Sequence, residues 1–388
     1  MDDTRLRVVL GWHMHQPEYR EPPHGTYRLP WTYLHAIKDY ADMAAHLEQV
    51  PAARAVVNFA PLLLEQLADY AEQVDAFIER ALPLRDPVLA GLVADPFPTD
   101  AASRAALVQA ALRAHPERLI ARYAPYEALA RRANALHLQP EDIGDAFLAD
   151  LLVWFHLAWM GESLKREDAF LRGLVAQGGR YTLRQRRDLL ALIGRVCGDL
   201  VPRYRALLEG GQVELSVTPY GHPILPLLLD IGCAAEAMPG APLPQRRYPG
   251  GEARARWHLE KAVAVFESAF GERPRGCWAS EGAISDDALR LLPDVGLQWA
   301  ASGQGVLGHS LGASAPSFPV QPYRLSPQHP ALFFRDDDLS DRIGFRYQTW
   351  SPDAAVEDFV QGLEERAHVA PPGAVVTIFL DGENAWEH

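Results

Sequence analysis

Seven short runs of β-branched and apolar residues recur along the chain, and each ends in polar or turn-forming residues. Runs of this length and composition predict β-strands. Their ranges are 5–12, 53–59, 211–218, 273–280, 297–302, 331–336 and 374–381. Amphipathic helical patterns lie between several of them, at 61–84, 181–208, 252–270, 285–293 and 353–367. Strands that alternate with helices predict an α/β fold built on a parallel sheet or barrel.

One long segment departs from this alternation. Residues 62–208 read as almost continuous helix, broken at prolines and at Gly178 and Gly179, which predicts a large helical insertion. The chain is therefore expected to have three parts, which are 1–61 with the first barrel strands, 62–208 as the helix-rich insertion, and 209–388 with the rest of the barrel. The proline-rich segment 223–250 is expected to be an irregular surface loop near the strand ends.

Charge and cysteine usage narrow the classes of function. The chain has 388 residues with 50 acids against 37 bases, and the net charge of −13 disfavours nucleic-acid and membrane-surface partners. No stretch is long and apolar enough to predict a spanning helix, and the start does not read as a signal peptide. The three scattered cysteines indicate neither a disulfide framework nor a CxxC metal site, which favours a reducing cytoplasm. No cofactor is expected.

Polar and aromatic residues gather at the ends of the predicted strands. If the strands form a parallel barrel, the loops that leave their carboxyl ends converge on one mouth. The residues expected there are His13, His15 and Gln16 after the first run, Asn58 after the second, His222 after the third, Trp278 and Glu281 after the fourth, Arg335 and Asp336 after the sixth, and Asp381, Glu383 and Trp386 after the seventh. The sequence therefore predicts a site rich in acids, histidines and aromatic side chains.

Two carboxylates flanked by aromatic residues suit the cleavage of a glycosidic bond. One carboxylate attacks or stabilises the sugar centre, the other protonates the leaving oxygen, and aromatic faces stack on sugar rings. Glu281 and Asp381 lie far apart in the sequence, but one barrel would bring both to the same mouth. Their alternative interpretations are local: Glu281 can be an acid at a helix N-terminus, and Asp381 a turn residue before Gly382.

Four stretches resemble, in order and spacing, the motifs of family 57 glycoside hydrolases. They are HMHQP at 13–17, GQVELSVTPYGHPILP at 211–226, WASEGAIS at 278–285 and LDGENAWEH at 380–388. The segments WTYLHAIKDYADM at 31–43 and FFRDDDLSDRIGF at 333–345 add to this resemblance, which is greatest to the amylopullulanase and α-amylase branch and covers nearly the whole chain. It implies an incomplete seven-stranded (β/α) barrel and retaining action on α-glucans or maltooligosaccharides.

The same resemblance implies individual roles. It places the nucleophile at Glu281 and the general acid/base at Asp381, and it maps substrate-binding motif residues onto His15, Glu214, His222 and Trp278. Family members also carry a motif in a C-terminal helical region that helps to close the cleft. This chain stops at His388, so that region is expected to be absent.

Several residues keep two interpretations. Glu214 alternates with apolar neighbours, so it is expected to point into the barrel towards a partner such as His15 or a sugar hydroxyl, or else to form an outward salt bridge. Arg335, Asp336 and Asp341 either bind substrate or pair with each other. Glu383 either tunes Asp381 or is a solvated acid, and Trp278 and Trp386 are expected as sugar platforms or as core.

The leading hypothesis is a retaining α-glucan hydrolase, in which Asp381 begins the cycle protonated and so has a raised pKa. The nearest alternative is a 4-α-glucanotransferase or branching enzyme with the same carboxylates. A metal-dependent hydrolase would instead use His13, His15, His222 and Asp381 as ligands. The last alternative is a non-catalytic glucan-binding protein.

Overall fold

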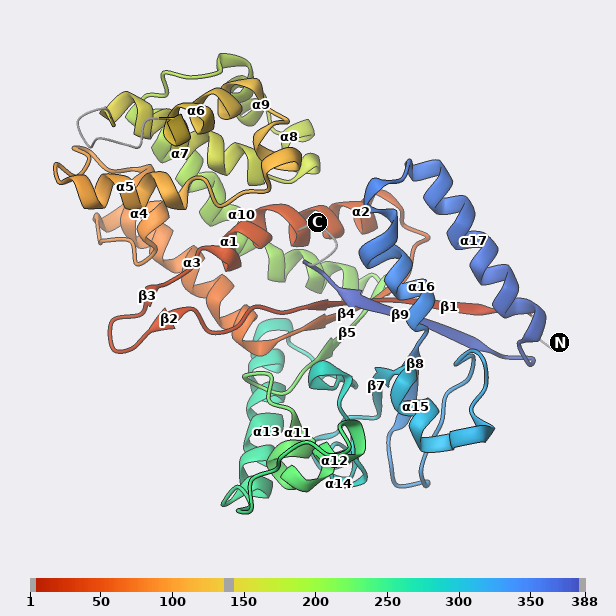
Figure 1. Cartoon of the computed structure of the whole chain (residues 1–388). Coiled ribbons are helices and arrows are strands. Elements are labelled where there is room, and N and C mark those ends of the chain that lie inside the picture. The colour runs from red at the N-terminus through yellow and green to blue at the C-terminus, as the bar shows by residue number, and fades with distance from the viewer. Residues whose placement is uncertain (1–4, 136–142, 384–388) are drawn as a thin grey trace.

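The computed structural model describes residues 5–135 and 143–383, and its centre is a closed barrel of seven parallel strands (Figure 1). The strands are β1 (Arg7–Met14), β4 (Ala55–Phe59), β5 (Val213–Val217), β6 (Gly276–Trp278), β7 (Trp299–Gly303), β8 (Ala331–Arg335) and β9 (Val375–Asp381). They are hydrogen-bonded in chain order, and β9 closes the ring onto β1. The predicted seven-stranded barrel is confirmed, and it has one strand fewer than the eight of the common (β/α) barrel.

The ladders around the ring differ in length. Strands β1 and β9 pair in register from Arg7↔Val375 to His13↔Asp381. In contrast, β5 meets β6 through Val217↔Cys277 alone, and β8 meets β9 through Arg335↔Thr377 alone. These two seams divide the barrel into a four-strand arc, β9–β1–β4–β5, and a three-strand arc, β6–β7–β8.

Large rings fill the barrel interior. Trp278 and Phe379 stack with centroids 4.4 Å apart and planes 6° from parallel. Gly11 lies beside the Phe379 ring, where an added Cβ would come within 2.2 Å of a ring carbon, so this position requires glycine. Lower in the barrel, Trp299 donates its indole N–H to Glu214 at 2.6 Å.

The helices predicted between strands are present within a few residues of their expected ends. They are α3 (Pro61–Arg80), α10 (Leu183–Glu209), α13 (Gly251–Phe270), α14 (Asp286–Leu291) and α17 (Pro352–Val369). Local sequence explains their ends. Helix α3 begins with a proline at its first position, α10 begins with a capping box between Thr182 and Gln185, and α13 ends at left-handed Gly271.

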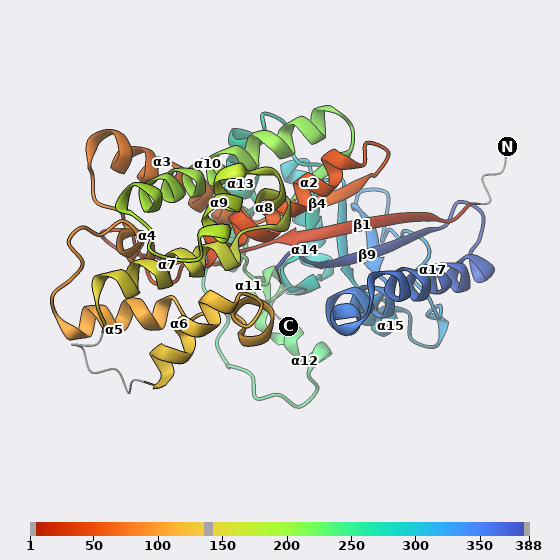
Figure 2. The same ribbon diagram turned by 90° about the horizontal axis from the view of Figure 1, so that it is seen from above.

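Between α3 and α10 the described chain is helical and packs as a lobe beside the carboxyl end of the barrel (Figures 1 and 2). Its helices are α4 (Pro87–Leu92), α5 (Ala101–Ala110), α6 (Ala124–Ala135), α7 (Asp145–Trp159), α8 (Glu162–Glu167) and α9 (Ala169–Gln177). Helix α7 is buried around nearly its whole circumference, as expected for a helix that is apolar on all faces. The division of the chain into three domains stays a prediction.

One helical segment next to the barrel mouth contains a π-helical turn. Helix α1 (Trp31–His35) continues through η1 (Ala36–Tyr40) into α2 (Ala41–Gln49). Such turns inside longer helices are frequent at functional sites. A two-stranded hairpin, β2 (Arg20–Glu21) with β3 (Thr26–Tyr27), precedes this segment.

Several short elements were not predicted. They are helices α11 (Leu225–Leu229), α12 (Ala234–Ala237), α15 (Gln304–Leu311) and α16 (Asp337–Asp341), and the turns η2 (Pro116–Ile120), η4 (Ile231–Cys233), η5 (Ser280–Gly282), η6 (Pro293–Val295), η7 (Gly312–Ser314), η8 (Arg342–Arg346) and η9 (Tyr347–Thr349). The loop expected at 223–250 contains two of these short helices and is otherwise irregular. In the described ranges, no helix combines the length and apolar character needed to cross a membrane.

Candidate active site

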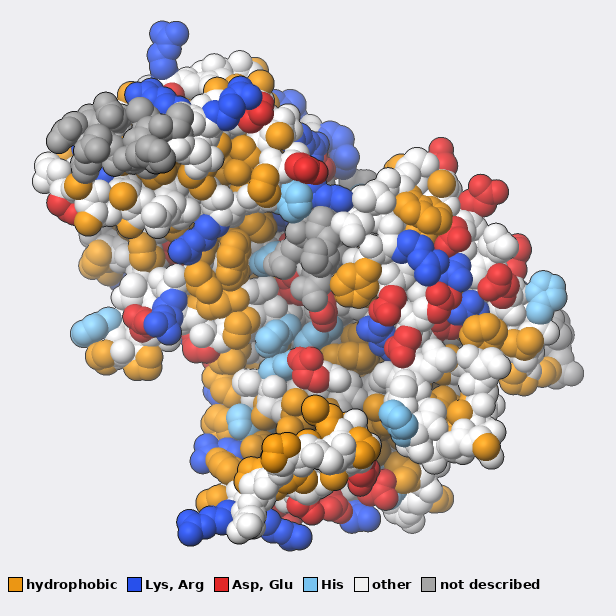
Figure 3. All heavy atoms as spheres, viewed as in Figure 1, with side chains coloured by type: hydrophobic (Ala, Val, Ile, Leu, Met, Phe, Trp, Pro, Cys, Tyr) orange, Lys and Arg blue, Asp and Glu red, His pale blue; other side chains and the backbone are white. Residues whose placement is uncertain are grey.

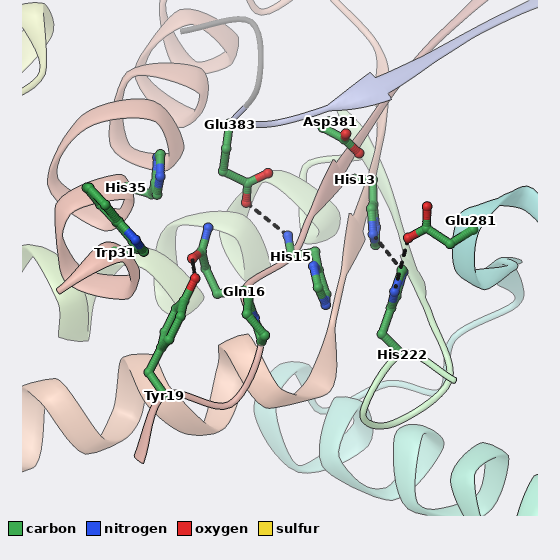
Figure 4. Close-up of a pocket in the computed structure, with 11 residues that line it drawn as sticks. His13, His15, Gln16, Tyr19, Trp31, His35, His222, Glu281, Asp381 and Glu383 are labelled. Atoms are coloured by element: carbon green, nitrogen blue, oxygen red, sulfur yellow. Dashed lines mark hydrogen bonds and ion pairs between the residues drawn. The ribbon is translucent and has the colours of Figure 1, made fainter. Parts of the chain in front are cut away.

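A pocket opens at the carboxyl mouth of the barrel, in the central hollow where Figure 3 shows histidines beside acids. The residues that line it are His13, His15, Gln16, Pro17, Tyr19, Trp31, His35, His222, Glu281, Asp381 and Glu383. Seven of these residues were predicted as site residues, and Figure 4 shows how they lie. Residues at or just after the ends of the barrel strands therefore form most of the pocket lining.

Glu281 and Asp381 reach the pocket from the two arcs of the barrel. Glu281 lies in η5 just after β6, and its side chain is 69% exposed. Asp381 is the last residue of β9 and pairs in register with His13 of β1. Burial raises the pKa of Asp381, the charge of Glu281 raises it further, and the charge of Arg335 opposes both. Asp381 is thus biased towards its protonated form beside a second carboxylate.

The backbone is left-handed at two of the lining residues. Glu281 and His222 each have a φ of 56°, a conformation that costs a non-glycine residue roughly 1–2 kcal/mol. Hydrogen bonds around Glu281 hold this turn, because the Gly282 N–H donates to the Ala279 carbonyl at 2.7 Å and the Ser302 hydroxyl donates to the Gly282 carbonyl at 2.5 Å. The turn directs the Glu281 carboxylate into the pocket (Figure 4).

Three histidines form a stacked cluster beside the carboxylates. The ring centroids of His13 and His15 are 5.5 Å apart, and those of His15 and His222 are 4.2 Å apart. Nε2 of His13 lies 3.1 Å from Nε2 of His222, while Nδ1 of His13 lies 2.7 Å from the Asn58 amide oxygen. Burial, followed by repulsion from the neighbouring ring, lowers the pKa of His13 and His222 to about 3 and that of His15 to about 4. The cluster is therefore neutral at pH 7.

Glu383 is a buried carboxyl in the middle of the pocket wall (Figure 4). Its Oε1 accepts hydrogen bonds from the His15 backbone N–H at 2.9 Å and from the Tyr40 hydroxyl. Burial raises its pKa to about 8, although both hydrogen bonds oppose the shift; the charges of Asp381 and Asp39 add to it. Glu383 is consequently protonated at pH 7 and can donate as well as accept.

The opposite wall comes from α1 and the chain before it. Trp31 and His35 line it, and His35 Nδ1 lies 2.5 Å from the Asp39 carboxylate. Both rings also pack against Trp159 of the insertion, with centroids 5.7 and 5.6 Å away. Sequence reasoning missed His35, Tyr19 and Tyr40. The spacing of Trp31, His35 and Asp39, four residues apart on one helix face, was the signal that could have found His35.

Glu214 and Trp278 are not among the residues that line the pocket: Trp278 is buried in the barrel interior, and Glu214 is solvent-exposed. Glu214 does point inward, but its partner is the Trp299 indole and it lies one layer of side chains below Ser216 on β5. Trp278 stacks on Phe379, with its ring centroid 6.3 Å from that of His13. Substrate binding by these two side chains stays a prediction.

Arg335 and Asp336 are engaged in ion pairs outside the pocket. Asp336 is fully buried, receives two hydrogen bonds from Arg366 at 2.8 and 2.9 Å, and caps α16 through the Leu339 N–H. Arg335 pairs with Asp337 at 2.9 Å and with Asp341, which is the pairing that the sequence left open as an alternative. These contacts tie both residues to neighbouring helical segments, and their binding of substrate stays a prediction. Trp386 lies outside the described residues.

The predicted metal alternative finds no ligand set in the described part of the chain. No group of three or more histidine, cysteine or acidic side chains there is arranged to hold a metal ion. Both ring nitrogens of His13 are already engaged, one by Asn58 and the other by His222.

A parallel (β/α) barrel with two carboxylates at its carboxyl mouth, one of them biased towards protonation, defines the class of barrel proteins with a glycosidase-type site. Within that class, the model of glycosyl hydrolase family 57 matches residues 9–388, and the chain belongs to this family. No curated protein sequence matches the chain.

Three solved structures illustrate the relationship. The chain is 16% identical to family 57 branching enzymes from Thermococcus kodakaraensis and Pyrococcus horikoshii, both with a TM-score of 0.52, and 14% identical to the α-amylase AmyC from Thermotoga maritima, with a TM-score of 0.53. Each match covers 98% of this chain, and it covers 65%, 64% and 68% of the respective relatives. At these identities the likeness shows the fold, and the chain spans about two thirds of the length of these proteins.

Proposed function

We propose that the chain is a retaining glycoside hydrolase that acts on α-glucans, with Glu281 as nucleophile and Asp381 as general acid/base. The observation that carries the proposal is the raised pKa of Asp381 next to the exposed carboxylate of Glu281 in one pocket. Two carboxyls whose environments separate their protonation states are the usual basis of acid and nucleophile roles. The family and the amylase and branching-enzyme relatives support α-glucans as the substrate class.

The proposed cycle has two displacements. Glu281 attacks the anomeric carbon and the bond to the leaving oxygen breaks, while that oxygen takes the proton of Asp381. Asp381, now ionised, removes a proton from water as the water oxygen attacks the anomeric carbon. The ester bond to Glu281 then breaks, which frees the carboxylate and gives a product of retained configuration.

The remaining wall supplies sugar contacts without net charge. The neutral histidines and the protonated Glu383 offer both donors and acceptors, which match the hydroxyl groups of a glucan. Trp31 offers an aromatic face on the side opposite Glu281. We infer that the protein works in the cytoplasm, since its three cysteines are free thiols.

The test is turnover by the full chain on amylose, pullulan and a maltooligosaccharide, with the anomeric form of the first product followed by NMR. We expect reducing ends that appear first as the α-anomer. Release of the β-anomer first would contradict the retaining mechanism. Binding without turnover would instead favour a non-catalytic glucan-binding protein.

Glycosyl transfer is the second candidate, and the likeness to two branching enzymes favours it. A sugar hydroxyl would replace water in the second displacement, and the same carboxylates would act. Products longer than the starting maltooligosaccharide, or new branch points, would identify transfer. Shorter products alone would identify hydrolysis.

A further inference from the structure

A chain of hydrogen bonds runs from the barrel interior to His222, which lies beside the proposed nucleophile. It begins at Ser216 on β5, whose Oγ accepts from the Asn58 amide nitrogen at 3.0 Å. The Asn58 amide oxygen lies 2.7 Å from Nδ1 of His13, and Nε2 of His13 lies 3.1 Å from Nε2 of His222. Nδ1 of His222 then faces Oε1 of Glu281 at 3.6 Å. Ser216 and Asn58 are fully buried.

The direction of each bond follows from the first one. Because the amide nitrogen of Asn58 donates to Ser216, its oxygen is the atom that faces His13, and an oxygen there can only accept. Nδ1 of His13 therefore carries the proton. A neutral imidazole carries one ring proton, so Nε2 of His13 must accept the proton of His222 Nε2. Nδ1 of His222 is left with its lone pair directed at the site.

The environment of His13 and His222 keeps both rings uncharged. His13 is faced by His15 from its own strand, by His222 from the loop after β5, and by Asp381 from β9. His222 is faced by Glu281 from the turn after β6, and Glu383 contacts the backbone of His15. Arg335 influences Asp381 from β8. Burial outweighs these acids, since the pKa values of both rings are lowered.

We propose that Asn58 is a positioning residue for this site: acting through His13, it fixes the tautomer of His222 so that His222 Nδ1 accepts a hydrogen bond from a sugar hydroxyl beside Glu281. This inference rests on the proposed function for its sugar ligand. The same tautomer prevents His222 from donating to Glu281, so the carboxylate keeps the electron density with which it attacks. Protonation of His13 would reverse the chain, because His13 Nε2 would then donate to His222 and move the His222 proton to Nδ1.

The tautomers can be observed without any activity. The protein is labelled with 15N-histidine, and long-range 15N–1H spectra at pH 7 distinguish Nδ1–H from Nε2–H rings, with assignment by His13→Gln and His222→Gln variants. We expect His13 as the Nδ1–H form and His222 as the Nε2–H form. The opposite pair of tautomers, which a flipped Asn58 amide would produce, overturns the proposal. This result stands whether or not the chain hydrolyses glucans.

Two substitutions of Asn58 test the functional consequence. Asn58→Leu removes the acceptor; we expect mixed tautomers of His222 and a loss of kcat/KM of about tenfold, the worth of one hydrogen bond. Asn58→Asp keeps an acceptor, so the tautomers should stay. Its carboxylate favours the imidazolium form of His13, so the acidic limb of the kcat/KM profile should move to higher pH.

The controls separate positioning from folding. Gln73→Leu removes another buried amide, one that accepts from the Arg85 N–H at 2.8 Å in the helical part of the chain, and should change stability but neither tautomers nor the pH profile. If the Asn58→Leu protein does not fold, the Asn58→Asp variant still tests the proposal. An unshifted acidic limb in Asn58→Asp, or an Asn58→Leu protein with wild-type tautomers and kcat/KM, overturns the proposal.

Discussion

Asp336 and Glu383 both follow barrel strands, and both are buried, with exposed fractions of 0% and 5%. Asp336 follows β8 and meets the guanidinium of Arg366 through two hydrogen bonds. Glu383 follows β9 and meets only uncharged donors, the Tyr40 hydroxyl and the His15 N–H, among the hydrogen bonds of the described residues. Burial alone therefore does not determine what an acidic side chain does. A buried carboxylate paired with a cation stays ionised and links two parts of the fold, whereas burial without a cation raises the pKa of Glu383, even though its two neutral donors oppose that rise.

Glu281, the proposed nucleophile, differs from both of these buried acids because its side chain is mostly exposed. Glu281→Gln should lower kcat on amylose by about 10⁴-fold or more, because the amide is a poor nucleophile. The free energy of unfolding should change by less than about 0.5 kcal/mol, as is usual for exposed positions. Initial rates and urea denaturation on the same sample measure the two effects. Turnover at the parent rate would remove Glu281 as nucleophile.

Arg366→Met should have the opposite effect: it should lower stability and leave the rate almost unchanged. It leaves Asp336 buried without its cation, which costs about 3–5 kcal/mol of unfolding free energy, while kcat per folded molecule should stay close to the parent value. Denaturant melts and active-site-normalised rates check both parts. The double variant Asp336→Asn with Arg366→Met is the matched control and should recover part of the stability. An Arg366→Met protein that is as stable as the parent would contradict this role of the Asp336–Arg366 pair.

Glu383→Gln should change how stability depends on pH. The folded pKa of about 8 lies above the usual 4.5, so between these values the folded state holds a proton that the unfolded state has lost. The stability contributed by Glu383 is therefore present at low pH and lost as the pH rises towards 8. Relative to Glu383→Gln, the parent should lose up to about 1.4 kcal/mol per pH unit. Denaturation of both proteins at pH 5, 6.5 and 8 measures this difference. An unfolding free energy that depends on pH in the same way in both proteins would contradict the prediction.

Arg335→Met should produce the smallest effect, a shift in a pH profile. The charge of Arg335 lowers the pKa of Asp381, so its removal should raise that pKa. Since Asp381 must start protonated, the basic limb of kcat/KM should move to higher pH. Arg256→Met, which breaks an exposed pair with Asp294, is the control and should leave the limb in place. A downward shift would show that Arg335 acts on another group.

The sequence carried the fold because its periodicities are local. Strands such as 374–381 end where the chain changes from apolar to acidic, and the structure places β9 at Val375–Asp381. Parallel strands share one direction, so every strand end reaches the same mouth, and this brought His13, Glu281 and Asp381 together as expected. The resemblance to family 57 supplied their roles, which stay proposals.

The sequence did not predict how far below the barrel mouth a side chain lies or which distant residue it pairs with. Alternation put Glu214 on the same face of its strand as Ser216, but two residues along a strand span about 6.6 Å, enough to move a side chain from the mouth to the layer below, where Glu214 is solvent-exposed and contacts Trp299. Asp336 sits at a strand end, yet its partner Arg366 is thirty residues away on α17, and no local pattern pairs them. His35 comes from a helix and not from a strand end, so a prediction based on strand ends could not include it.

The two short seams of the barrel bear on the reaction in a different way. Glu281 belongs to the three-strand arc and Asp381 to the four-strand arc, and each seam between the arcs rests on a single register pair. The distance between the two carboxylates therefore depends on how the two arcs are placed relative to each other. The way the two arcs are held together therefore bears on the carboxylate separation, which is about 5.5 Å in retaining enzymes and about 6.5 Å or more in inverting ones. For the proposed reaction, the pairing of neighbouring strands is thus as relevant as the residues that line the pocket.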